Sequence, residues 1–316
     1  MRRVLVVHYS QTGQLTEVVK AFTQPLLKNP EIEVTFECIE PEVDYPFPWP
    51  FLKFFRIFPE TVYMQPPRMK PYSIASTDKF DLIILAYQVW FLSPSLPTTA
   101  FLRSELAKNI FKGTPVITLI ACRDMWLMAQ EKVKKELQHL EARLIDNVAL
   151  VDECGSALSF LSTPLWMFTG SKGPRRFSPK AGVSTEDIKN CDRFGKRIAQ
   201  ALNSSSSPLH DPLLQGLGAV KIKEKIIATE VMAHRSFLLW GKLLRAMGEQ
   251  DSLARAIGLC FYIVFLIFLI LTVVPISALI KKLLSPLTKK HIEKQKLYYS
   301  QPSGEGRLLI LGKKNE

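Results

Sequence analysis

Five short apolar runs separated by amphipathic segments constrain the fold of this chain more than any other feature. The runs are rich in Val, Ile and Leu, and we predict strands at residues 3–9, 32–39, 81–86, 115–121 and 144–151. Segments with helical spacing follow at residues 15–27, 96–108, 125–140 and 185–202, the last with Ser184 as a candidate N-cap. Strands that alternate with helices predict a doubly wound α/β fold with a parallel sheet.

The turn after the first predicted strand has the composition of an anion site. It reads SQTGQLT at residues 10–16, so hydroxyl groups and Gly13 lie between a buried strand and the start of a helix. Backbone N–H groups of such a loop, together with the positive end of the helix dipole, bind anions. No lysine follows as it does in nucleotide-triphosphate loops. The turn therefore indicates a site for a monoester phosphate, with an ordinary capped turn as the alternative.

The longest uncharged segment lies near the C-terminus. Residues 256–280 form 25 consecutive positions without a charged side chain, and about 20 apolar residues are enough to span a hydrocarbon core. The basic residues from Lys281 to Lys296 are expected on the cytoplasmic side. The N-terminal part is expected there too, because its first apolar run is too short for a signal peptide. Either the segment is re-entrant, bent near Pro275 with both ends cytoplasmic, or it spans the membrane against the charge rule.

Positive charge is concentrated in the same region. The formal net charge is +12; residues 219–316 carry 16 basic and 7 acidic side chains, and residues 1–218 carry 25 and 22. Residues 219–247 place apolar side chains at near-helical spacing with basic ones between them, as in an amphipathic helix on anionic lipid. The alternative is a helix packed on its own domain. Lysines beside an apolar segment favour phospholipid, and nucleic acid is not expected as a partner.

Four segments resemble flavodoxin-like FMN proteins, in the same order along the chain. SQTGQLT after VLVVHY resembles their phosphate loop, and LIILAYQVWFLSPSLPTTAFL (82–102) and LIACRDMW (119–126) resemble the two later strands with their loops. GVSTEDIKNCDRFGKRIAQAL (182–202) resembles the last helix of flavodoxin-like NAD(P)H-quinone oxidoreductases. The resemblance covers about residues 1–203. It implies a five-stranded parallel sheet in the order 2-1-3-4-5, with FMN at the carboxyl ends of the central strands.

The resemblance also implies three groups of FMN-contacting residues. The phosphate group would lie on Ser10, Gln11, Thr12, Gly13, Gln14, Leu15 and Thr16. One wall of the ring site would be Tyr87, Gln88, Val89, Trp90 and Phe91, with Trp90 as the stacking aromatic residue. The other wall would be Ala121, Cys122, Arg123 and Asp124. Arg123 would place positive charge near the flavin, or else form a surface salt bridge. The basic segment at residues 170–176 would receive a dinucleotide phosphate or anionic lipid, or be a solvated loop.

An insertion at residues 41–77 distinguishes the chain from a plain flavodoxin. Its aromatic residues predict an ordered segment, either a lid for a lipophilic substrate or a surface packed on the domain or a second subunit. FPWPFLKFFRIFPET together with YQVWFLSPSLPTTAFL resembles bacterial flavodoxin-like proteins named as dialkylresorcinol-condensing enzymes, which are associated with aryl-lipid synthesis. Condensation needs a nucleophilic cysteine with a histidine partner, and no histidine is placed near Cys122 in sequence. A flavin redox step, such as oxidative aromatisation, is therefore favoured.

We accordingly divide the chain into an FMN domain (1–203), a linker (204–218), an interfacial helix region (219–255), a transmembrane or re-entrant segment (256–280) and a basic tail (281–316). We expect a membrane-attached FMN oxidoreductase at the cytoplasmic face of the bacterial inner membrane. Its substrate would be a quinone or aryl-lipid intermediate, with NAD(P)H as a possible electron donor. The alternatives are an electron carrier to a redox partner protein and a non-catalytic scaffold, and a homo-oligomer is possible. Five widely spaced cysteines predict neither a disulfide framework nor a metal site.

Overall fold

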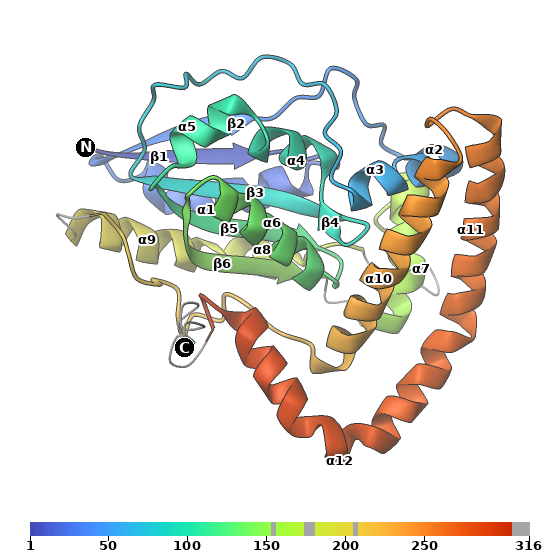
Figure 1. Cartoon of the computed structure of the whole chain (residues 1–316). Coiled ribbons are helices and arrows are strands. Elements are labelled where there is room, and N and C mark those ends of the chain that lie inside the picture. The colour runs from blue at the N-terminus through green and yellow to red at the C-terminus, as the bar shows by residue number, and fades with distance from the viewer. Residues whose placement is uncertain (153–155, 174–180, 205–207, 305–316) are drawn as a thin grey trace, which may run out of the picture.

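A parallel sheet forms the centre of the molecule (Figure 1). The computed structural model describes residues 1–152, 156–173, 181–204 and 208–304. Its main strands are β1 (Arg2–His8), β2 (Ile32–Cys38), β3 (Leu82–Trp90), β5 (Pro115–Cys122) and β6 (Arg143–Val151), in the order β2-β1-β3-β5-β6. The two-residue β4 (Ser93–Pro94) pairs antiparallel with the end of β3. Without β4, this is the predicted order 2-1-3-4-5, so the predicted sheet is confirmed.

Helices cover both faces of the sheet, because successive strand residues point to opposite sides. Val4 and Val6 of β1 pack in one core with α1 (Gln14–Leu27) and α9 (Asp192–Ser204). Leu5 and Val7 pack in a second core with α4 (Leu96–Leu102), α5 (Glu105–Phe111) and α6 (Leu127–His139). The chain thus forms the three layers expected of a doubly wound fold.

Two predicted helices are each divided in the structure. Residues 96–108 form α4 and the start of α5, because the side chain of Ser104 accepts the N–H of Ala107 and begins a new helix. Residues 185–202 form α8 (Thr185–Asn190) and most of α9, with a break at Cys191. Ser184 caps α8 as predicted, by accepting the N–H of Asp187. Each division follows a local hydrogen bond or break that hydrophobic spacing does not reveal.

Gly195 allows α1 and α9 to approach each other closely. A Cβ atom at this position would lie 2.0 Å from the carbonyl oxygen of Phe22. We expect Gly195→Ala to lower the free energy of unfolding by about 1–3 kcal/mol, because the two helices would have to separate. Urea unfolding of the full-length protein in detergent measures this change. Gln200→Ala, at an exposed position of α9, is the control and should change stability by less than about 0.5 kcal/mol. Equal stabilities of the two variants would contradict the close contact.

The insertion between β2 and β3 contains two short helices that hydrophobic spacing did not predict. These are α2 (Phe51–Arg56) and α3 (Phe58–Val62). Trp49, just before α2, is 3% exposed, and Phe58 is fully buried. Much of the insertion is therefore packed on the domain, and its first part also covers the cavity described below.

Three long helices follow the sheet domain. The first, α10 (Glu224–Ala246), packs on α3 and α6, and buries Ile227, Glu230 and Leu244. Packing on the protein's own domain is the alternative considered for the amphipathic residues 219–247. Contact of α10 with lipid remains a prediction. Figure 1 shows that α11 (Leu253–Leu271) and α12 (Val273–Ser300) together form a V. One arm is α11 with the first part of α12, the chain turns sharply within α12, and the end of α12 returns to the sheet domain. Residues 305–316 of the predicted basic tail lie outside the described residues.

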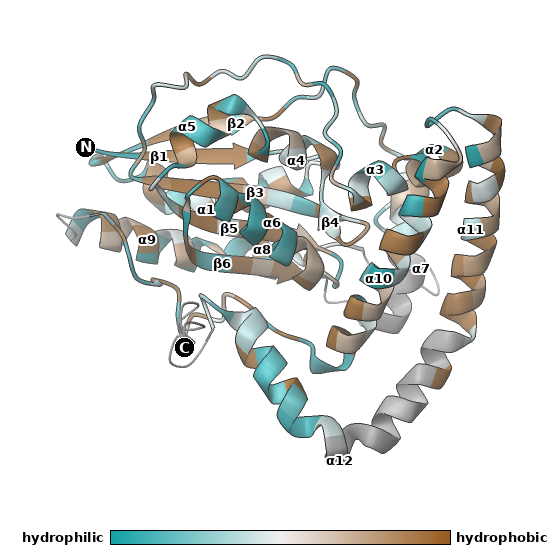
Figure 2. Cartoon of the chain, in the orientation of Figure 1, coloured by the Kyte–Doolittle hydropathy of each residue, from teal (hydrophilic) through white to brown (hydrophobic). Residues whose placement is uncertain are grey.

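The helix break lies at Thr272, close to the predicted bend at Pro275. Proline has no N–H to donate to the carbonyl of the residue four positions earlier, which here is Leu271, the last residue of α11. Among the described residues, α11 is the one helix whose 19 residues and mean hydropathy of 2.5 would suffice to cross a membrane. Figure 2 shows that α11 is largely hydrophobic, whereas the last part of α12 is hydrophilic.

Candidate functional site

The carboxyl ends of four parallel strands meet at one cavity. Ligands in doubly wound folds bind at this edge, where the strand order reverses, which here is between β1 and β3. The cavity holds about 160 Å³. Residues predicted to contact FMN contribute much of its lining: Gln11, Thr12, Gln14, Leu15, Gln88, Val89, Trp90, Phe91, Ala121, Cys122 and Arg123. The structure therefore brings together three loops that lie far apart in the sequence.

The remaining predicted residues do not line the cavity. Ser10, Gly13 and Thr16 shape the loop behind it, where the Ser10 hydroxyl accepts the N–H of Thr16 at 3.3 Å. Tyr87 lies behind the cavity, since its side chain is fully buried in the core and its hydroxyl donates to Gln130 at 2.5 Å, and its contact with FMN stays a prediction. The contact of Asp124 with FMN also stays a prediction. Asp124 is 8% exposed and pairs at 2.9 Å with Lys223, just before α10.

Several lining residues were not predicted as FMN contacts. Phe47, Trp49 and Phe54 come from the insertion, and Thr163, Trp166 and Met167 come from α7 (Ser156–Thr169), a helix that the sequence patterns missed. Asp152 and Gly182 complete the lining, and Asp152 accepts the N–H of Gly182 at 2.9 Å. Asp152 directly follows the last strand, so its position at a carboxyl strand end was the signal that would have identified it.

The loop before α1 presents a helix N-terminus at the cavity, and the Ser10 hydroxyl accepts one of its first N–H groups, that of Thr16. The N-cap residue Gly13 has φ +80°, provides no side chain to cap the helix, and has open space where a Cβ atom would point. Its neighbour Gln14 is held elsewhere, since the Gln14 amide bonds both the N–H and the carbonyl of Val183 at 3.2 and 3.4 Å. Thr12 and Gln11 line the cavity, where the Thr12 hydroxyl accepts the N–H of Gln14 at 3.5 Å and the Gln11 amide donates to the carbonyl of Pro46 at 2.8 Å. This end of the site fits a phosphate group.

The ring end of the site is covered by aromatic side chains. Trp90 is 8% exposed and makes edge contacts with Tyr45 at 5.0 Å and with Trp49 at 6.0 Å. The N–H of Trp49 donates to the carbonyl of Met167 at 2.8 Å, which joins the insertion to α7. A cavity of about 150 Å³ holds one benzene ring. The three fused rings of FMN therefore fit only if this aromatic cover moves outward.

Two side chains on the β5 loop have perturbed acidity. Burial lowers the pKa of Arg123, while the carboxylates of Asp124 and Asp152 act in the opposite direction. Burial raises the pKa of the Cys122 thiol well above its ordinary value, and the charges of Asp124 and Glu230 raise it further. The Cys122 thiol is therefore protonated at neutral pH, unlike an activated nucleophile.

The basic segment at residues 170–176 is described only as far as residue 173. There Lys172 Nζ lies 5.0 Å from the centre of the Trp166 ring, next to the cavity. Residues 174–176, which include both arginines of the segment, lie outside the described residues. Its proposed contact with a dinucleotide phosphate or with anionic lipid stays a prediction.

Comparison with known proteins gives only distant structural similarity. No protein-family model and no curated protein matches the chain. A flavoprotein of Lactobacillus acidophilus in complex with FMN has 14% identity and a TM-score of 0.38, covering 47% of this chain and 93% of that one. A WrbA-like flavodoxin of Agrobacterium tumefaciens has 11% identity and a TM-score of 0.35, covering 64% and 98%. Oxidised flavodoxin 1 of Bacillus cereus has 15% identity and a TM-score of 0.33, covering 65% and 99%. At TM-scores this low the similarity carries no argument about function, and the fold rests on the strand order.

Proposed function

We propose that the protein is an FMN-dependent oxidoreductase, attached through residues 219–280 to the cytoplasmic face of the bacterial inner membrane and acting on a lipophilic substrate. One observation carries the proposal. The N-terminus of α1 and its hydroxyl-bearing loop lie at one end of a cavity whose other end is aromatic. A phosphate-bearing, planar aromatic cofactor matches both ends, and it lies where doubly wound folds bind their ligands.

Different residues of the cavity would bind the phosphate group and the ring system of such a cofactor. FMN, when bound, supplies two-electron transfer, and the protein binds and orients it. Gln11, Thr12 and the N–H groups at the start of α1 would hold the phosphate. Trp90 would lie against one side of the ring system, and Cys122 and Arg123 against the other. Arg123 would stabilise negative charge that forms on the reduced ring.

A row of aromatic side chains supports a lipophilic substrate. From the cavity, Trp49 contacts Phe54 at 5.7 Å, and Phe54 contacts Phe168 at 5.8 Å. Phe168 in turn contacts Phe51 at 5.2 Å, and Phe51 is 47% exposed on α2. A continuous row of apolar side chains thus joins the surface to the ring site, which supports a lipophilic substrate such as a quinone or an aryl-lipid intermediate. An electron carrier would need instead an accessible ring edge.

FMN binding is expected to quench the fluorescence of the three cavity tryptophans, Trp49, Trp90 and Trp166. Gly13→Val should weaken FMN affinity at least about tenfold, because valine is strained at the positive φ of Gly13 and obstructs the loop. Fluorescence titration measures both effects. Gly216→Val is a matched control, since Gly216 has φ +78° and open space as well, but lies in the linker. Equal FMN affinity of the two variants would place the phosphate elsewhere.

The two classes of substrate are tested with opposite oxidation states of FMN. FMN reduced by light or by NAD(P)H should be rapidly reoxidised by quinones, whereas oxidised FMN should be reduced without oxygen by a cyclohexanedione, which loses two electrons and two protons to become a resorcinol. Reoxidation only by a carrier protein would favour the electron-carrier alternative. A protein that binds no FMN would favour the scaffold. The protonated thiol of Cys122 argues against acyl condensation, so Cys122→Ser should retain FMN-dependent turnover.

A further inference from the structure

We infer that α11 lies along a single leaflet of the bilayer without crossing it, with its outward face among the acyl chains and both of its flanks held on the sheet domain. The inference rests on the membrane attachment in the proposed function and specifies its geometry. The sequence left open a membrane span and a re-entrant segment. The inference favours the arrangement in which both ends of the segment lie on the cytoplasmic face.

The first half of α11 is part of the folded domain. Arg255 is 4% exposed, Leu259 is 3% exposed and Tyr262 is fully buried. The Tyr262 ring stacks on Phe58 of α3 at 4.5 Å, and the Arg255 guanidinium contacts both carboxylate oxygens of Glu60 at 2.6 Å. A span perpendicular to the bilayer would draw this half of α11 into the hydrocarbon core. The buried ion pair and α3 would then have to enter the bilayer or break from α11.

The chain after α11 returns to the same domain. The hydroxyl of Tyr298, at the end of α12, donates to Glu131 of α6 at 2.8 Å. Ser303 is 2% exposed, and its hydroxyl donates to Asp146 of β6 at 2.7 Å. Both flanks of the uncharged segment are therefore fixed to one domain. A span would need them on opposite sides of a hydrocarbon core about 30 Å thick.

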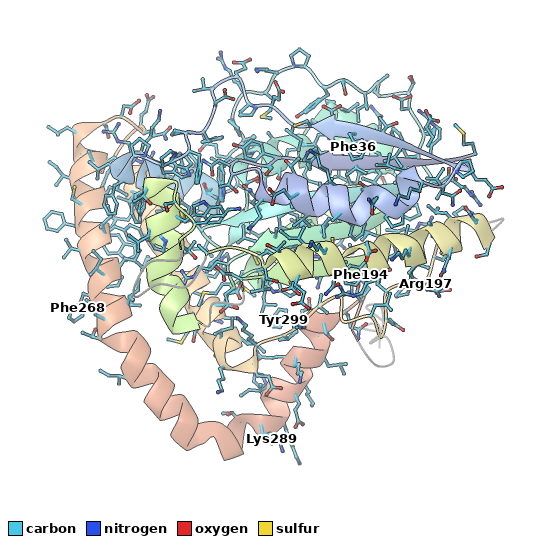
Figure 3. The ribbon with its side chains drawn as sticks, turned by 180° about the vertical axis from the view of Figure 1, so that it is seen from behind. Phe36, Phe194, Arg197, Phe268, Lys289 and Tyr299 are labelled. Carbon is cyan, nitrogen blue, oxygen red and sulfur yellow. The ribbon has the colours of Figure 1, made fainter. Side chains whose placement is uncertain are left out.

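The outward face of α11 is apolar from end to end. Steps of three or four residues place six exposed side chains on one face: Leu253, Ile257, Phe261, Val264, Phe268 and Leu271. Each is at least 51% exposed, and Figure 3 shows Phe268 on the side of α11 that faces away from the domain. A 19-residue helix is about 28 Å long at 1.5 Å per residue. An exposed apolar face of this length indicates a surface that contacts a membrane or another protein.

The charged residues on either side of this apolar face favour a lipid leaflet as the partner that covers it. From residue 252 to residue 292 the sequence contains no acidic residue. Exposed Lys242 and Arg245 of α10 precede the apolar face, with Glu249 and Asp251, which pairs with Arg56, between α10 and α11. Exposed Lys289 and Lys290 of α12 follow it (Figure 3 labels Lys289). Anionic headgroups complement such a border. A second copy of the chain would bring like charges together instead.

Depth measurements along α11 test the geometry. In a full-length background with Cys38, Cys154 and Cys260 replaced by serine, Leu253→Cys, Phe261→Cys and Phe268→Cys each receive an environment-sensitive fluorophore. Vesicles of anionic and zwitterionic phospholipid then carry a quencher either near the headgroups or near the bilayer centre. We expect the headgroup-side quencher to be the more effective at all three positions, and Gln200→Cys, at an exposed position of α9, to show no quenching. A change of the favoured quencher along the helix would overturn the inference.

Sidedness provides a second, independent test. An impermeant maleimide should label Lys290→Cys and the native, exposed Cys38 from the same side of inner-membrane vesicles. Labelling from opposite sides would show a span. Failure to bind vesicles would refute the membrane attachment itself, whereas FMN titration of the same samples tests the flavin part of the proposed function separately. Cross-linking of Phe261→Cys between copies, without lipid quenching, would assign the face to a second chain and overturn the inference.

Discussion

Arg255→Ala is expected to lower the free energy of unfolding by about 3–5 kcal/mol, because it leaves the carboxylate of Glu60 without its cation in a nearly buried place. The side chains of Arg255 and Glu60 are only 5% and 16% exposed, and Arg255 also donates to the carbonyl of Arg56 at 3.3 Å. The pair joins α11 to α3 of the insertion. Trp240 reports the change, since its ring contacts Tyr262 of α11 at 5.3 Å and its fluorescence follows the separation of the helices.

A second ion pair between the same parts of the chain is the matched control. Arg56 pairs with Asp251 at 3.1 Å, but these side chains are 41% and 89% exposed. Arg56→Ala should therefore cost less than about 1 kcal/mol. The double variant Arg255→Met with Glu60→Gln should recover most of the lost stability, since no unpaired charge remains. If Arg255→Ala were no more damaging than Arg56→Ala, burial would not be what makes the Arg255–Glu60 pair important.

Features set by local sequence were predictable, and features set by distant contacts were not. The five strands follow from apolar runs, because a strand covered on both faces must be apolar along its length. Trp90 and Arg123 reach the cavity because each lies at a carboxyl strand end. Asp124 also lies there, yet it turns towards Lys223, a partner 99 positions later in the chain. The spacing of residues along the sequence does not predict such an ion pair.

Proline residues explain why the two helices of the insertion, and helix α7, were not predicted. Pro50 directly precedes α2, and Pro59 lies in the first turn of α3, where proline is tolerated because the first N–H groups of a helix have no partner within it. Pro164 lies inside α7, a position that normally argues against a helix. If proline is taken as a signal for the start of a helix, the sequence predicts α2 and α3, but it does not predict α7.

The docking of α10 is expected to depend on pH through Glu230. Its carboxyl group is fully buried and accepts the N–H of Met128 at 2.8 Å. Trp126, the N-cap residue of α6, makes no side-chain cap bond, so Glu230 caps α6 from a different helix. Burial raises its pKa from 4.5 to about 8, although the N–H groups of Met128 and Leu127 act to lower it. The folded protein therefore holds this proton at a pH where the unfolded chain has released it.

Stability should consequently fall as pH rises from about 4.5 to about 8. The folded state binds more protons than the unfolded state in this window, and the difference between the two pKa values corresponds to a loss on the order of 4–5 kcal/mol. Glu230→Gln keeps an oxygen that accepts the N–H of Met128 but cannot ionise. Its free energy of unfolding should lack this loss, so the wild-type and variant curves separate as pH increases. Urea unfolding across this pH range measures both curves.

Comparison with Glu230→Gln is needed because a second carboxyl group contributes to the wild-type curve. Burial raises the pKa of Asp146 from 3.8 to about 6, against the N–H groups of Leu213 and Leu214 and the hydroxyl of Ser303, which lower it. Asp146 is unchanged in the variant, so its contribution cancels in the difference. Glu230→Ala should be less stable than Glu230→Gln by about 1 kcal/mol at every pH, because α6 loses its cap. Parallel wild-type and Glu230→Gln curves would mean that Glu230 is ionised in the folded protein. Its carboxylate would then need a cation or further donors, which its observed contacts do not provide.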